Sequence, residues 1–447
     1  ARRTGFPGIT MTATILEFVI VLAAILLGAR QGGLAIGYWG GLGLVLLAVI
    51  FGVTPTAPPV DVMLIIMAVC MSAAAMDAAG GLEFLVRIAA RIIRSNPKYV
   101  SIIAPLVGFF LTFFSGTGNL IFAIHPVIYE VAYSAGVRPE RPMASATVAA
   151  QIGITACPIS AATAALLGLF AAYGHAEVTL SSILMVTFPA CLIGVLAGSF
   201  IYMFWGKELK DDPEYQRRLK AGLVEPPEAI SDQPLPKGAK LSVGIFLLGV
   251  FLIVLTGFFP ELRTIHGKPV SMSLVIEMVM LAGAALMVAF CHVNLDVASK
   301  SPTLRAGVVS VGAIFGIAWL ADSFIGANKG FFMELAGDLA AQAPWLFAFV
   351  LFFMSALLTS QGATTRAIMP LGLTLGIPVP MMIAMFPAVN GLFFLPITGP
   401  ALSAVSFDRS GTTKIGKYIL NHSFQIPGIV MVVVSVVVAM LLTQLGL

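Results

Sequence analysis

Charged side chains are scarce in this sequence. Lys and Arg number 25 and Asp and Glu 21, so charged residues make up 10% of the 447 residues, against 59% hydrophobic ones. Soluble domains carry about 25% charged residues. The low charge and the mean hydropathy of +0.99 exclude an ordinary soluble domain and indicate a polytopic membrane protein.

Cysteine is also scarce. The four cysteines lie in or beside apolar runs without metal-ligand spacing, and they are Cys70, Cys157, Cys191 and Cys291. We interpret them as core thiols rather than disulfides or zinc ligands, and we expect no metal and no cofactor. The net charge of +4 is attributed to cytoplasmic loops, so the expected surroundings are membrane lipids and not nucleic acid.

Apolar runs predict transmembrane helices, because about 20 apolar residues cross about 30 Å of hydrocarbon. In the first half of the chain they cover 13–29, 34–53, 60–79, 144–172 and 180–205. In the second half they cover 241–259, 272–291, 306–322, 381–405 and 420–446. The fold class predicted is therefore all-α, with five spans in each half.

The most polar stretch of the chain, residues 206–240, separates the two halves. Its charges and prolines predict a solvated cytoplasmic linker between a first repeat, 11–205, and a second repeat, 241–447. Residues 1–10 precede Met11, and we interpret them as a remnant of expression outside the fold.

Each half also contains an apolar segment that small polar residues interrupt. Segment 99–135 is interrupted by SGTGN, starting at Ser115, and segment 343–377 by SQGATTR, starting at Ser360. Backbone without helical hydrogen bonds survives in a membrane only when it is buried in protein or lines a water-filled cavity. The two segments therefore predict re-entrant hairpins.

The hairpins fix the relative orientation of the two halves. A hairpin enters and leaves on one side, so five spans in each half give two inverted repeats with discontinuous helices, which is typical of secondary transporters. With the N-terminus outside, most basic residues fall on the cytoplasmic side. These are Arg30, Arg87, Arg91, Arg94, Lys98, Arg138, Arg141, those of the linker, Lys300, Arg305, Arg409, Lys414 and Lys417, with Arg263, Lys268 and Lys329 as exceptions. Both termini are then periplasmic.

The repeat is visible in residue spacing. Ser115 follows Asp77 by 38 positions, and Ser360 follows Asp322 by the same 38, so SGTGN aligns with SQGAT at an offset of 245. Further on, GITACPIS (153–160) matches GLFFLPIT (391–398) at an offset of 238. The longer turn after the first hairpin absorbs the difference.

Two segments predict short amphipathic helices that lie along the membrane surface. GLEFLVRIAARIIRSNPKY places Arg87, Arg91 and Arg94 on one face, whereas NKGFFMELAGDLAAQAP carries Glu334 and Asp338. The arginines either satisfy topology and lipid headgroups alone or take part in transport.

The hairpin tips predict an anion site. A helix that begins at such a tip directs free N–H groups and the positive end of its dipole into the membrane. Pro158 and Pro396 break the spans after the hairpins, and Ser160 and Thr398 are expected to cap the helices that follow. Four helix N-termini would then converge, and two anion-binding centres suit a dicarboxylate. The competing interpretation is that small polar residues serve only as contacts between helices.

The candidate substrate-binding residues come from the tips and the broken helices. They are Ser115, Gly116, Thr117, Gly118, Asn119, Thr155, Ser160, Ser360, Gln361, Gly362, Thr364, Thr365, Arg366, Asn390 and Thr398.

Several charged residues have alternative interpretations. Arg366 within the membrane costs about 2.5–3.5 kcal/mol, so it needs a substrate carboxylate, a structural partner such as Asp322, or a place at the outer surface. Asp77 and Asp322 are interpreted as helix caps, with proton or sodium coupling as the alternative. His125 and Glu130 follow the first tip and are interpreted as packed in a helix, with a proton relay as the alternative.

Six sequence blocks together resemble the anaerobic C4-dicarboxylate transporters of the Dcu type, and the resemblance runs from Met11 to the C-terminus. The blocks are GARQGGLAIG, PPVDVMLIIMAV, RSNPKYVSIIAPLVGFFLTFFSGTGN, RPERPMA, FDRSGTTKIG and NHSFQIPG. The resemblance implies an exchanger of succinate, fumarate, malate and aspartate in the inner membrane of a bacterium that respires fumarate anaerobically. The wider ion transporter superfamily implies a homodimer of the elevator type, with a static scaffold and a moving transport domain.

The resemblance also implies roles for individual residues. Arginines tied to transport fall on Arg94 and Arg138, and the acidic residue expected one turn before Arg94 is Ala90 here. Some family members also act with a dicarboxylate-sensing histidine kinase, and Asp408 and Thr412 lie in the block that this role would involve.

Three rival functions compete with exchange of C4-dicarboxylates. The first is a carrier on the same architecture that couples Na⁺ or H⁺ to the uptake of another di- or tricarboxylate. The second is an intramembrane enzyme, but the spans contain no spaced carboxylate pair and no GxSG-type elbow, so we expect no enzyme. The third is a sensor or partner protein without transport.

Overall fold

The computed structural model describes residues 7–31, 34–58, 60–224, 234–328, 331, 343–396, 398–416 and 421–446. Within these ranges the chain is almost wholly helical. The strands of this part are β1 (Thr264–Ile265) and β2 (Lys268–Pro269), which pair antiparallel in one loop. A chain in lipid must satisfy its backbone groups internally, which helices do, and the predicted all-α class is confirmed.

The first half forms helices in every predicted span. Its elements are α1 (Pro7–Gln31), α2 (Ala35–Phe51), α3 (Val60–Ala78), α4 (Gly81–Ser95), η1 (Pro97–Tyr99), α5 (Val100–Ser115), η2 (Gly118–Leu120), α6 (Ile121–Ser134), α7 (Glu140–Ala156), α8 (Ala161–Ala172) and α9 (Leu180–Met203).

The middle of the chain and the second half follow the same pattern. The elements are η3 (Leu209–Asp211), α10 (Pro213–Lys220), α11 (Ala239–Phe258), η4 (Pro260–Arg263), α12 (Met272–Phe290), α13 (Leu295–Ser299), α14 (Pro302–Ala313), the π-helical turn η5 (Ile314–Ala318), α15 (Trp319–Ala327), η6 (Pro344–Leu346), α17 (Phe347–Leu358), α18 (Gln361–Thr374), α19 (Val379–Met385), the 3-10 helix η7 (Phe386–Phe394), α20 (Gly399–Phe407) and α21 (Gln425–Gln444).

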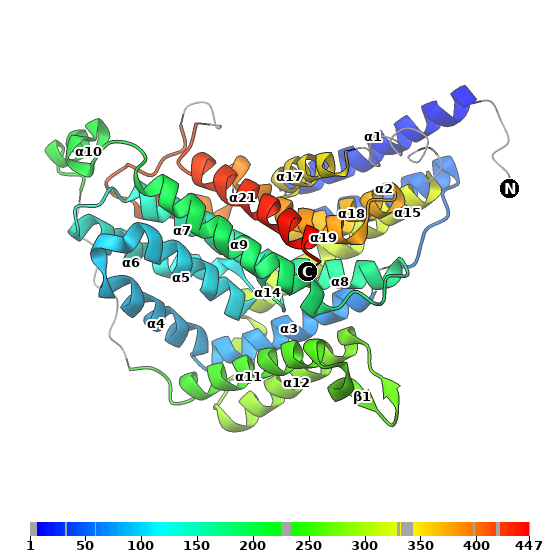
Figure 1. Cartoon of the computed structure of the whole chain (residues 1–447), viewed down its shortest axis with the longest axis horizontal. Coiled ribbons are helices and arrows are strands. Elements are labelled where there is room, and N and C mark those ends of the chain that lie inside the picture. The colour runs from blue at the N-terminus through cyan, green and yellow to red at the C-terminus, as the bar shows by residue number, and fades with distance from the viewer. Residues whose placement is uncertain are drawn as a thin grey trace.

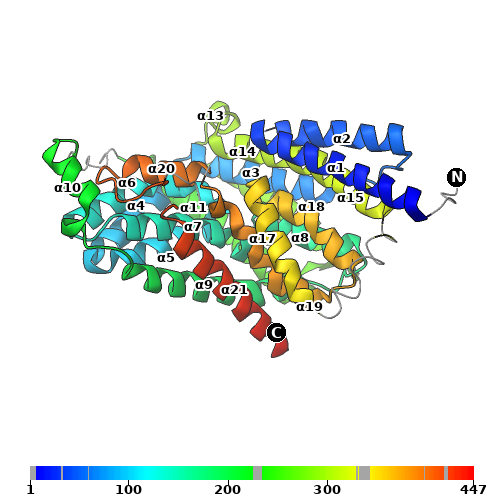
Figure 2. The same cartoon turned by 90° about the horizontal axis from the view of Figure 1, so that it is seen from above.

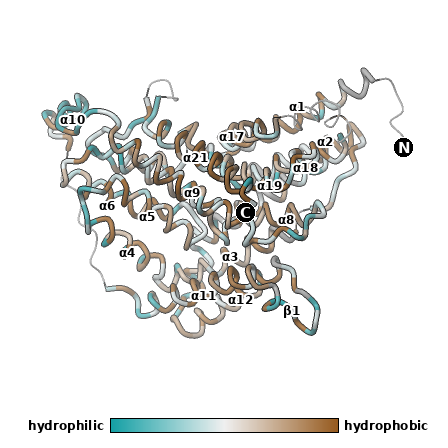
Figure 3. Tube along the Cα trace, viewed as in Figure 1, coloured by the Kyte–Doolittle hydropathy of each residue, from teal (hydrophilic) through white to brown (hydrophobic). Residues whose placement is uncertain are grey.

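The described helices identify a multi-pass membrane protein. Six of them are long and apolar enough to cross a membrane, and two bent helix pairs raise the number to as many as eight. Most helices are coloured hydrophobic along much of their length, whereas α10 is mostly hydrophilic (Figure 3). The hydrophilic residues of α10 therefore lie outside the spans.

The two halves of the chain interleave in space. Helix α10 lies at one end of the elongated molecule and α1 and α2 at the other (Figures 1 and 2). Helix α9 of the first half packs along α21 of the second, and α3 packs against both α12 and α14. Any site between the halves is therefore built from both.

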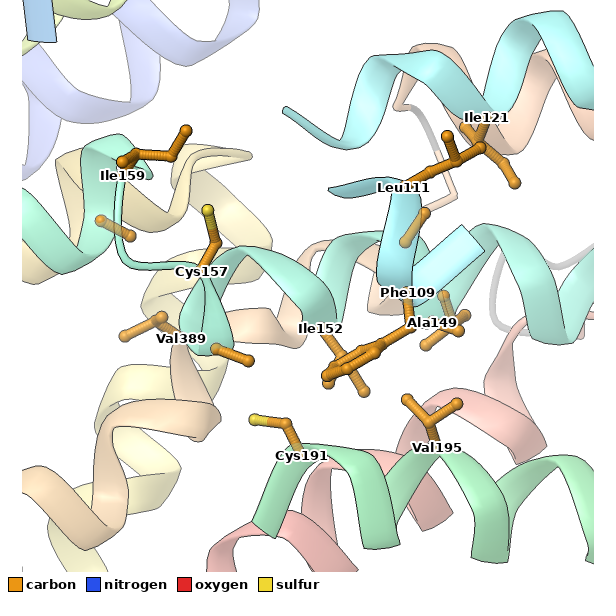
Figure 4. Close-up of a cluster of buried hydrophobic side chains, with 14 of the residues drawn as sticks. Phe109, Leu111, Ile121, Ala149, Ile152, Cys157, Ile159, Cys191, Val195 and Val389 are labelled. Carbon is orange, nitrogen blue, oxygen red and sulfur yellow. The ribbon is translucent and has the colours of Figure 1, made fainter. Parts of the chain in front are cut away.

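Small residues allow the central helices to approach closely, as is common in membranes. A Cβ atom at Gly194 of α9 would lie 2.5 Å from the Met431 carbonyl oxygen of α21. Phe109 of α5, Ile152 of α7 and Val195 of α9 point toward one another in the core (Figure 4). This core holds the helices that carry the first hairpin tip.

Three segments show detail that the sequence patterns do not. Helix α1 begins at Pro7, within segment 1–10, and proline is favoured in the first turn of a helix. The linker is partly folded, because Asp212 caps α10 through the amide groups of Glu214 and Tyr215. The span 306–322 is interrupted by η5, where the backbone of Gly316 approaches that of Gly37.

The first predicted surface helix is α4, which bends by 75° from α3. Its counterpart, with Glu334 and Asp338, lies outside the described residues.

Candidate functional site

The first hairpin tip breaks the helix where the sequence predicts a break. Helix α5 ends at Ser115, and Gly116 follows with a φ of 75°, a left-handed conformation that glycine adopts without strain. Thr117 then caps the next helix by accepting a hydrogen bond from the Asn119 amide at 3.2 Å. A Cβ atom at Gly108 of α5 would lie 3.4 Å from Ile121 Cδ1, so α6 turns back alongside α5.

The second tip has the same order of conformations. Thr359 is left-handed with a φ of 50°, and Ser360 caps α18 by accepting from the Ala363 amide at 3.3 Å. The matched positions are therefore Thr117 and Ser360, an offset of 243, and the predicted offset of 245 is wrong here. The sequence alignment matched Ser-x-Gly by residue type, whereas the backbone matches a left-handed residue followed by a capping hydroxyl.

The break between α7 and α8 is formed as predicted. Cys157 is extended, and Ser160 caps α8 by accepting from the Thr163 amide at 3.1 Å. The Ser160 hydroxyl also donates to the Ile154 carbonyl at 2.6 Å, so this buried hydroxyl is occupied within its own break.

The corresponding break between η7 and α20 differs. Thr398 stands at the N-cap position but makes no side-chain cap hydrogen bond, and its hydroxyl is buried without a partner among the described residues. The predicted capping role of Thr398 is therefore wrong.

A buried hydrogen-bonded chain joins the two broken helices to the second tip. Asn390 Nδ2 donates to Thr155 Oγ1 at 2.9 Å, and Gln361 Nε2 donates to Asn390 Oδ1 at 3.2 Å. These three residues, separated by up to 235 positions in sequence, are brought together as one polar cluster within the apolar core.

The helix N-termini approach each other in pairs. A Cβ atom at Gly362 of α18 would lie 3.5 Å from the Cβ of Ala161, the first residue of α8. A Cβ atom at Gly399 of α20 would lie 3.0 Å from the ring of Phe122 in α6. Gly116 in turn lies against Ile159, just before α8. The starting turns therefore lie in two neighbouring pairs, α18 with α8 and α20 with α6.

A cavity of about 90 Å³ lies at the first tip. Its polar lining includes Ser115, Thr117 and Thr303, and none of the described residues that line it is a lysine, an arginine or an acid. Gly116 adds backbone from the end of α5, and Ala161 adds backbone from the start of α8. Positive partial charge at this cavity therefore comes from the starts of the helices that follow Thr117 and Ser160, and not from the end of α5.

Two further cavities continue from this one. Thr117 and Thr303 also line a cavity of about 630 Å³ together with Asn119 and Asp77. Asp77 then lines a third cavity of about 330 Å³ with Lys300. Through these shared lining residues the three cavities form a row from the first tip to the segment before α14, which supplies both Asp296 and Lys300. The carboxylate of Asp77 faces this row and does not cap α4, which begins after Gly80 without a side-chain cap.

The remaining residues of the second tip are turned to other partners. Thr364 and Thr365 donate to the carbonyls of Ser360 and Gln361, one turn earlier in α18. Arg366 Nη2 lies 3.2 Å from Asp322 Oδ2 of α15, with 6% and 13% of the two side chains exposed. Of the three roles considered for Arg366, the structure shows the pair with Asp322.

Arg94 has an acidic partner that the sequence does not reveal. Its Nη2 lies 2.7 Å from Glu130 Oε2 of α6, which supplies the carboxylate absent at Ala90. His125 is buried between the hydroxyls of Ser403 and Thr147, at 2.9 and 3.0 Å, as the packed-helix interpretation expects.

Arg138 belongs to a different cluster, at the linker. Its Nε donates to Glu140 at 2.6 Å, and its Nη1 lies 2.8 Å from Asp212, with all three side chains no more than 8% exposed. The second Glu140 oxygen accepts from Ser423 at 2.6 Å. Arg138 is not part of the lining of the three cavities.

Asp408 organises its own loop. Its carboxylate accepts from Ser410, from the Thr412 hydroxyl at 2.9 Å and from the Thr413 amide at 2.6 Å. The Thr412 hydroxyl also accepts from the Glu140 amide. Asp408 is 1% exposed, so it holds this loop against the start of α7.

Sequence reasoning missed two residues of the first cavity, Cys70 of α3 and Thr303 of α14. No local motif marks either residue. The close contact of Gly307 with Cys70 is the reason α14 reaches the tip, and it depends on packing that the sequence does not display.

The chain matches known proteins over nearly its whole length. The model of a family described as anaerobic C4-dicarboxylate membrane transporters matches residues 13–447. The C4-dicarboxylate transporter DcuA of Escherichia coli (strain K12) is 43% identical over 425 residues, covering 94% of this chain and 97% of the relative. The anaerobic C4-dicarboxylate transporter DcuB of Escherichia coli O6:H1 is 39% identical over 430 residues, covering 94% and 96%.

Two solved transporters share the fold. The YdaH transporter of Alcanivorax borkumensis has a TM-score of 0.58 at 16% identity, covering 97% of this chain and 98% of its own. MtrF of Neisseria gonorrhoeae has a TM-score of 0.55 at 11% identity, covering 96% and 94%. Taken with the sequence matches, these findings show that the chain belongs to the family of anaerobic C4-dicarboxylate membrane transporters.

Proposed function

We propose that this protein exchanges C4-dicarboxylates, among them succinate, fumarate, malate and aspartate, across the inner membrane of a bacterium. The observation that carries the proposal is the cavity lined by Thr117 and Ala161, at the starts of η2 and α8, and by Ser115 and Gly116 at the end of α5. Helix N-termini bind anions through free N–H groups. A transporter, and not an enzyme, is the function that such a site supports.

The binding site comprises the two hairpin tips and the two broken helices. The α6 and α8 termini bind one carboxylate, and the cluster of Gln361, Asn390 and Thr155 leads to the α18 terminus for the other. The distance between these two carboxylate-binding ends of the site then selects for a four-carbon acid.

Obligate exchange follows from electrostatics. A dicarboxylate neutralises the positive helix ends and lets the loaded transport domain cross relative to a static scaffold. An empty domain keeps its positive ends in a medium of low dielectric constant, where partial charges are costly, and crosses slowly.

The arrangement in the membrane completes the proposal. The two halves are inverted repeats, and both termini are periplasmic because basic loops stay inside. The protein forms a homodimer. The loop of Asp408 and Thr412, which the Glu140 amide contacts, is the surface offered to a sensor histidine kinase.

Counterflow in proteoliposomes tests the function. Internal succinate should accelerate uptake of labelled fumarate without any ion gradient, and absence of this trans-stimulation would contradict exchange. Alanine variants of Ser115, Thr117 and Asn119 should lose uptake. Thr256→Ala is the matched control, because that hydroxyl donates to the Ile253 carbonyl of its own helix and Thr256 is not in the lining of any of the three cavities. Full uptake by the three tip variants would refute the site.

Asp77 supports a second candidate function, cation-coupled uptake of another di- or tricarboxylate. Asp77 lines two cavities, one of them together with Thr117 and Asn119, where a carboxylate suits a proton or a sodium ion. Uptake that needs an inward Na⁺ or H⁺ gradient, and that Asp77→Asn uncouples, would favour this candidate over exchange.

A further inference from the structure

The ion pair of Arg366 and Asp322 is incompletely satisfied. It has one contact of 3.2 Å, and both Arg366 Nε and Asp322 Oδ1 are buried without a hydrogen-bond partner among the described residues. Arginine and carboxylate usually form two parallel hydrogen bonds, and a buried unsatisfied donor is costly. Such a pair is held by its surroundings and is open to exchange for a better ligand.

The pair lies one turn from the proposed site. Helix α18 begins beside α8, where Gly362 faces Ala161, and Arg366 follows Gly362 by about one helical turn, roughly 6 Å. A small movement of α15 away from α18 would leave the guanidinium facing the α18 terminus.

The pair and the row of cavities lie toward opposite ends of α3. Trp319 and Ser323 of α15 hydrogen bond to Thr56, in the loop before α3, at 2.6 and 3.0 Å. Asp77, which lines the cavities, stands in the last turn of the 19-residue helix, and such a helix is about 28 Å long. The cavities lined by Asp77 therefore lie toward the end of α3 that leads into α4 with its arginines, which we call the side of the basic loops. The pair lies toward the other end of α3.

The first half has no equivalent of this pair. At the offset of the hairpin tips, Arg366 corresponds to Ala123, and at the offset predicted from sequence it corresponds to Ile121. Neither carries a charge, and the region around Ala123 lines the open cavity. The second half therefore has a buried guanidinium at the position where the first half has an uncharged residue beside a cavity.

We propose that Asp322 and Arg366 form a gate on the side opposite the basic loops, and that a substrate carboxylate opens it by replacing Asp322 on the guanidinium. The proposal rests on the proposed function and deepens it. Asp322 is a positioning residue that holds Arg366 one turn from the site, and Arg366 is the charged ligand that the uncharged cavity lacks.

Cys70 provides the test, because it lines the cavity at the tip, whereas the other three cysteines are buried. In a full-length variant with those three replaced by alanine, an impermeant thiol reagent should react from the side of the basic loops. Asp322→Asn should raise the labelling rate from the opposite side by about tenfold or more. Unchanged labelling would overturn the gate. Glu208→Gln, which removes the partner of Arg141 at 3.0 Å, should change nothing.

Transport kinetics test the contact with substrate. Asp322→Asn should lower the KM for external dicarboxylate, since the competing acid is gone, and also lower the maximal exchange rate. The charge swap Asp322→Arg with Arg366→Asp should restore slow labelling of Cys70 but not exchange. Restored exchange would show a purely structural pair and overturn the proposal. If Asp322→Asn elutes as aggregate, the charge-swap variant tests both the gate, through Cys70 labelling, and the contact with substrate, through exchange.

The two proposals fail in different ways. Absence of dicarboxylate counterflow by the unmodified chain would refute the function, whereas Cys70 labelling reports the gate without any transport. Added succinate should also accelerate labelling from the gated side in the unmodified pair, and absence of this acceleration would contradict opening by the substrate.

Discussion

Two buried arginines, Arg138 and Arg366, are 6% and 5% exposed, yet their surroundings differ sharply. Arg138 contacts one oxygen of Glu140 and one oxygen of Asp212. The other oxygen of each carboxylate also has a partner: Ser423 donates to Glu140, and the Glu214 amide donates to Asp212. Arg366 has one carboxylate partner and leaves polar atoms unpaired on both sides. Burial alone therefore does not distinguish a structural charge from a functional one.

Satisfaction of hydrogen bonds is what separates the two. The Arg138 cluster ties the linker, the start of α7 and the loop before α21 together, through Asp212, Glu140 and Ser423. Because its polar groups are paired, rearranging this cluster costs the free energy of several hydrogen bonds. The Arg366 pair lies next to helix ends that we propose bind substrate, and its incomplete pairing lowers the free-energy cost of rearrangement.

Arg138→Ala should have the largest effect on stability. It leaves Glu140 and Asp212 buried without their cation, and breaking a buried pair by removing one partner costs about 3–5 kcal/mol. Thermal unfolding in detergent, followed by size-exclusion chromatography, measures the loss. Arg217→Ala is the control, because that side chain is 66% exposed. A variant of Arg138 as stable as the control would break the comparison.

Arg366→Gln should lose transport with a smaller loss of stability than Arg138→Ala. Its pair has a single contact, so we expect about 1.5–3 kcal/mol from a charged hydrogen bond. Counterflow should fall by at least about tenfold, which corresponds to about 1.4 kcal/mol. Thermal unfolding and counterflow on the same preparation compare the two. Normal transport with strongly reduced stability would place Arg366 in the same class as Arg138.

The sequence predicts both helix breaks of each half because those breaks are local. Small polar residues and glycine at Ser115–Asn119, and proline at Pro158, interrupt a helix through their own backbone preferences. The capping role of Ser160 follows from the same local chemistry. Each predicted span contains a helix for the equally local reason that apolar runs of that length fold as helices in lipid.

Long-range packing limits the rest. Glu130 reaches Arg94 across 36 positions, and Thr303 reaches the first tip through α14, with no motif marking either. The sequence leaves three interpretations of Arg366 open, because it does not show which acid a buried arginine contacts. The folded start of the linker was missed even though Asp212, Pro213 and Glu214 form a helix-start pattern.

Arg94→Ala tests a third ion pair, which Arg94 forms with Glu130 and which is more exposed than the pairs of Arg138 and Arg366. Arg94 and Glu130 are 41% and 29% exposed, and exposed pairs contribute about 0–1 kcal/mol. We therefore expect a loss of stability below about 1 kcal/mol in thermal unfolding. Loss of counterflow at nearly unchanged stability would assign Arg94 to transport, whereas parallel loss through Glu130→Gln would attribute that role to the pair.

Glu214→Gln should have the smallest effect on stability, and it shows what a partly exposed acid contributes. Hydrogen bonds from Arg217 and then Arg218 lower the pKa of Glu214 from 4.5 to about 2. Because the folded pKa is depressed, its stabilisation of α10 is present above the unfolded pKa and is lost as pH falls from about 4.5 toward 2. Trypsin cleavage of unmodified α10 at neutral pH should be slow, and slightly faster in Glu214→Gln. Arg218 also donates to the Arg409 carbonyl at 3.4 Å, a contact that Glu214→Gln leaves in place. A large increase in the rate of trypsin cleavage would therefore mean that α10 depends on Glu214 rather than on its buried cap Asp212.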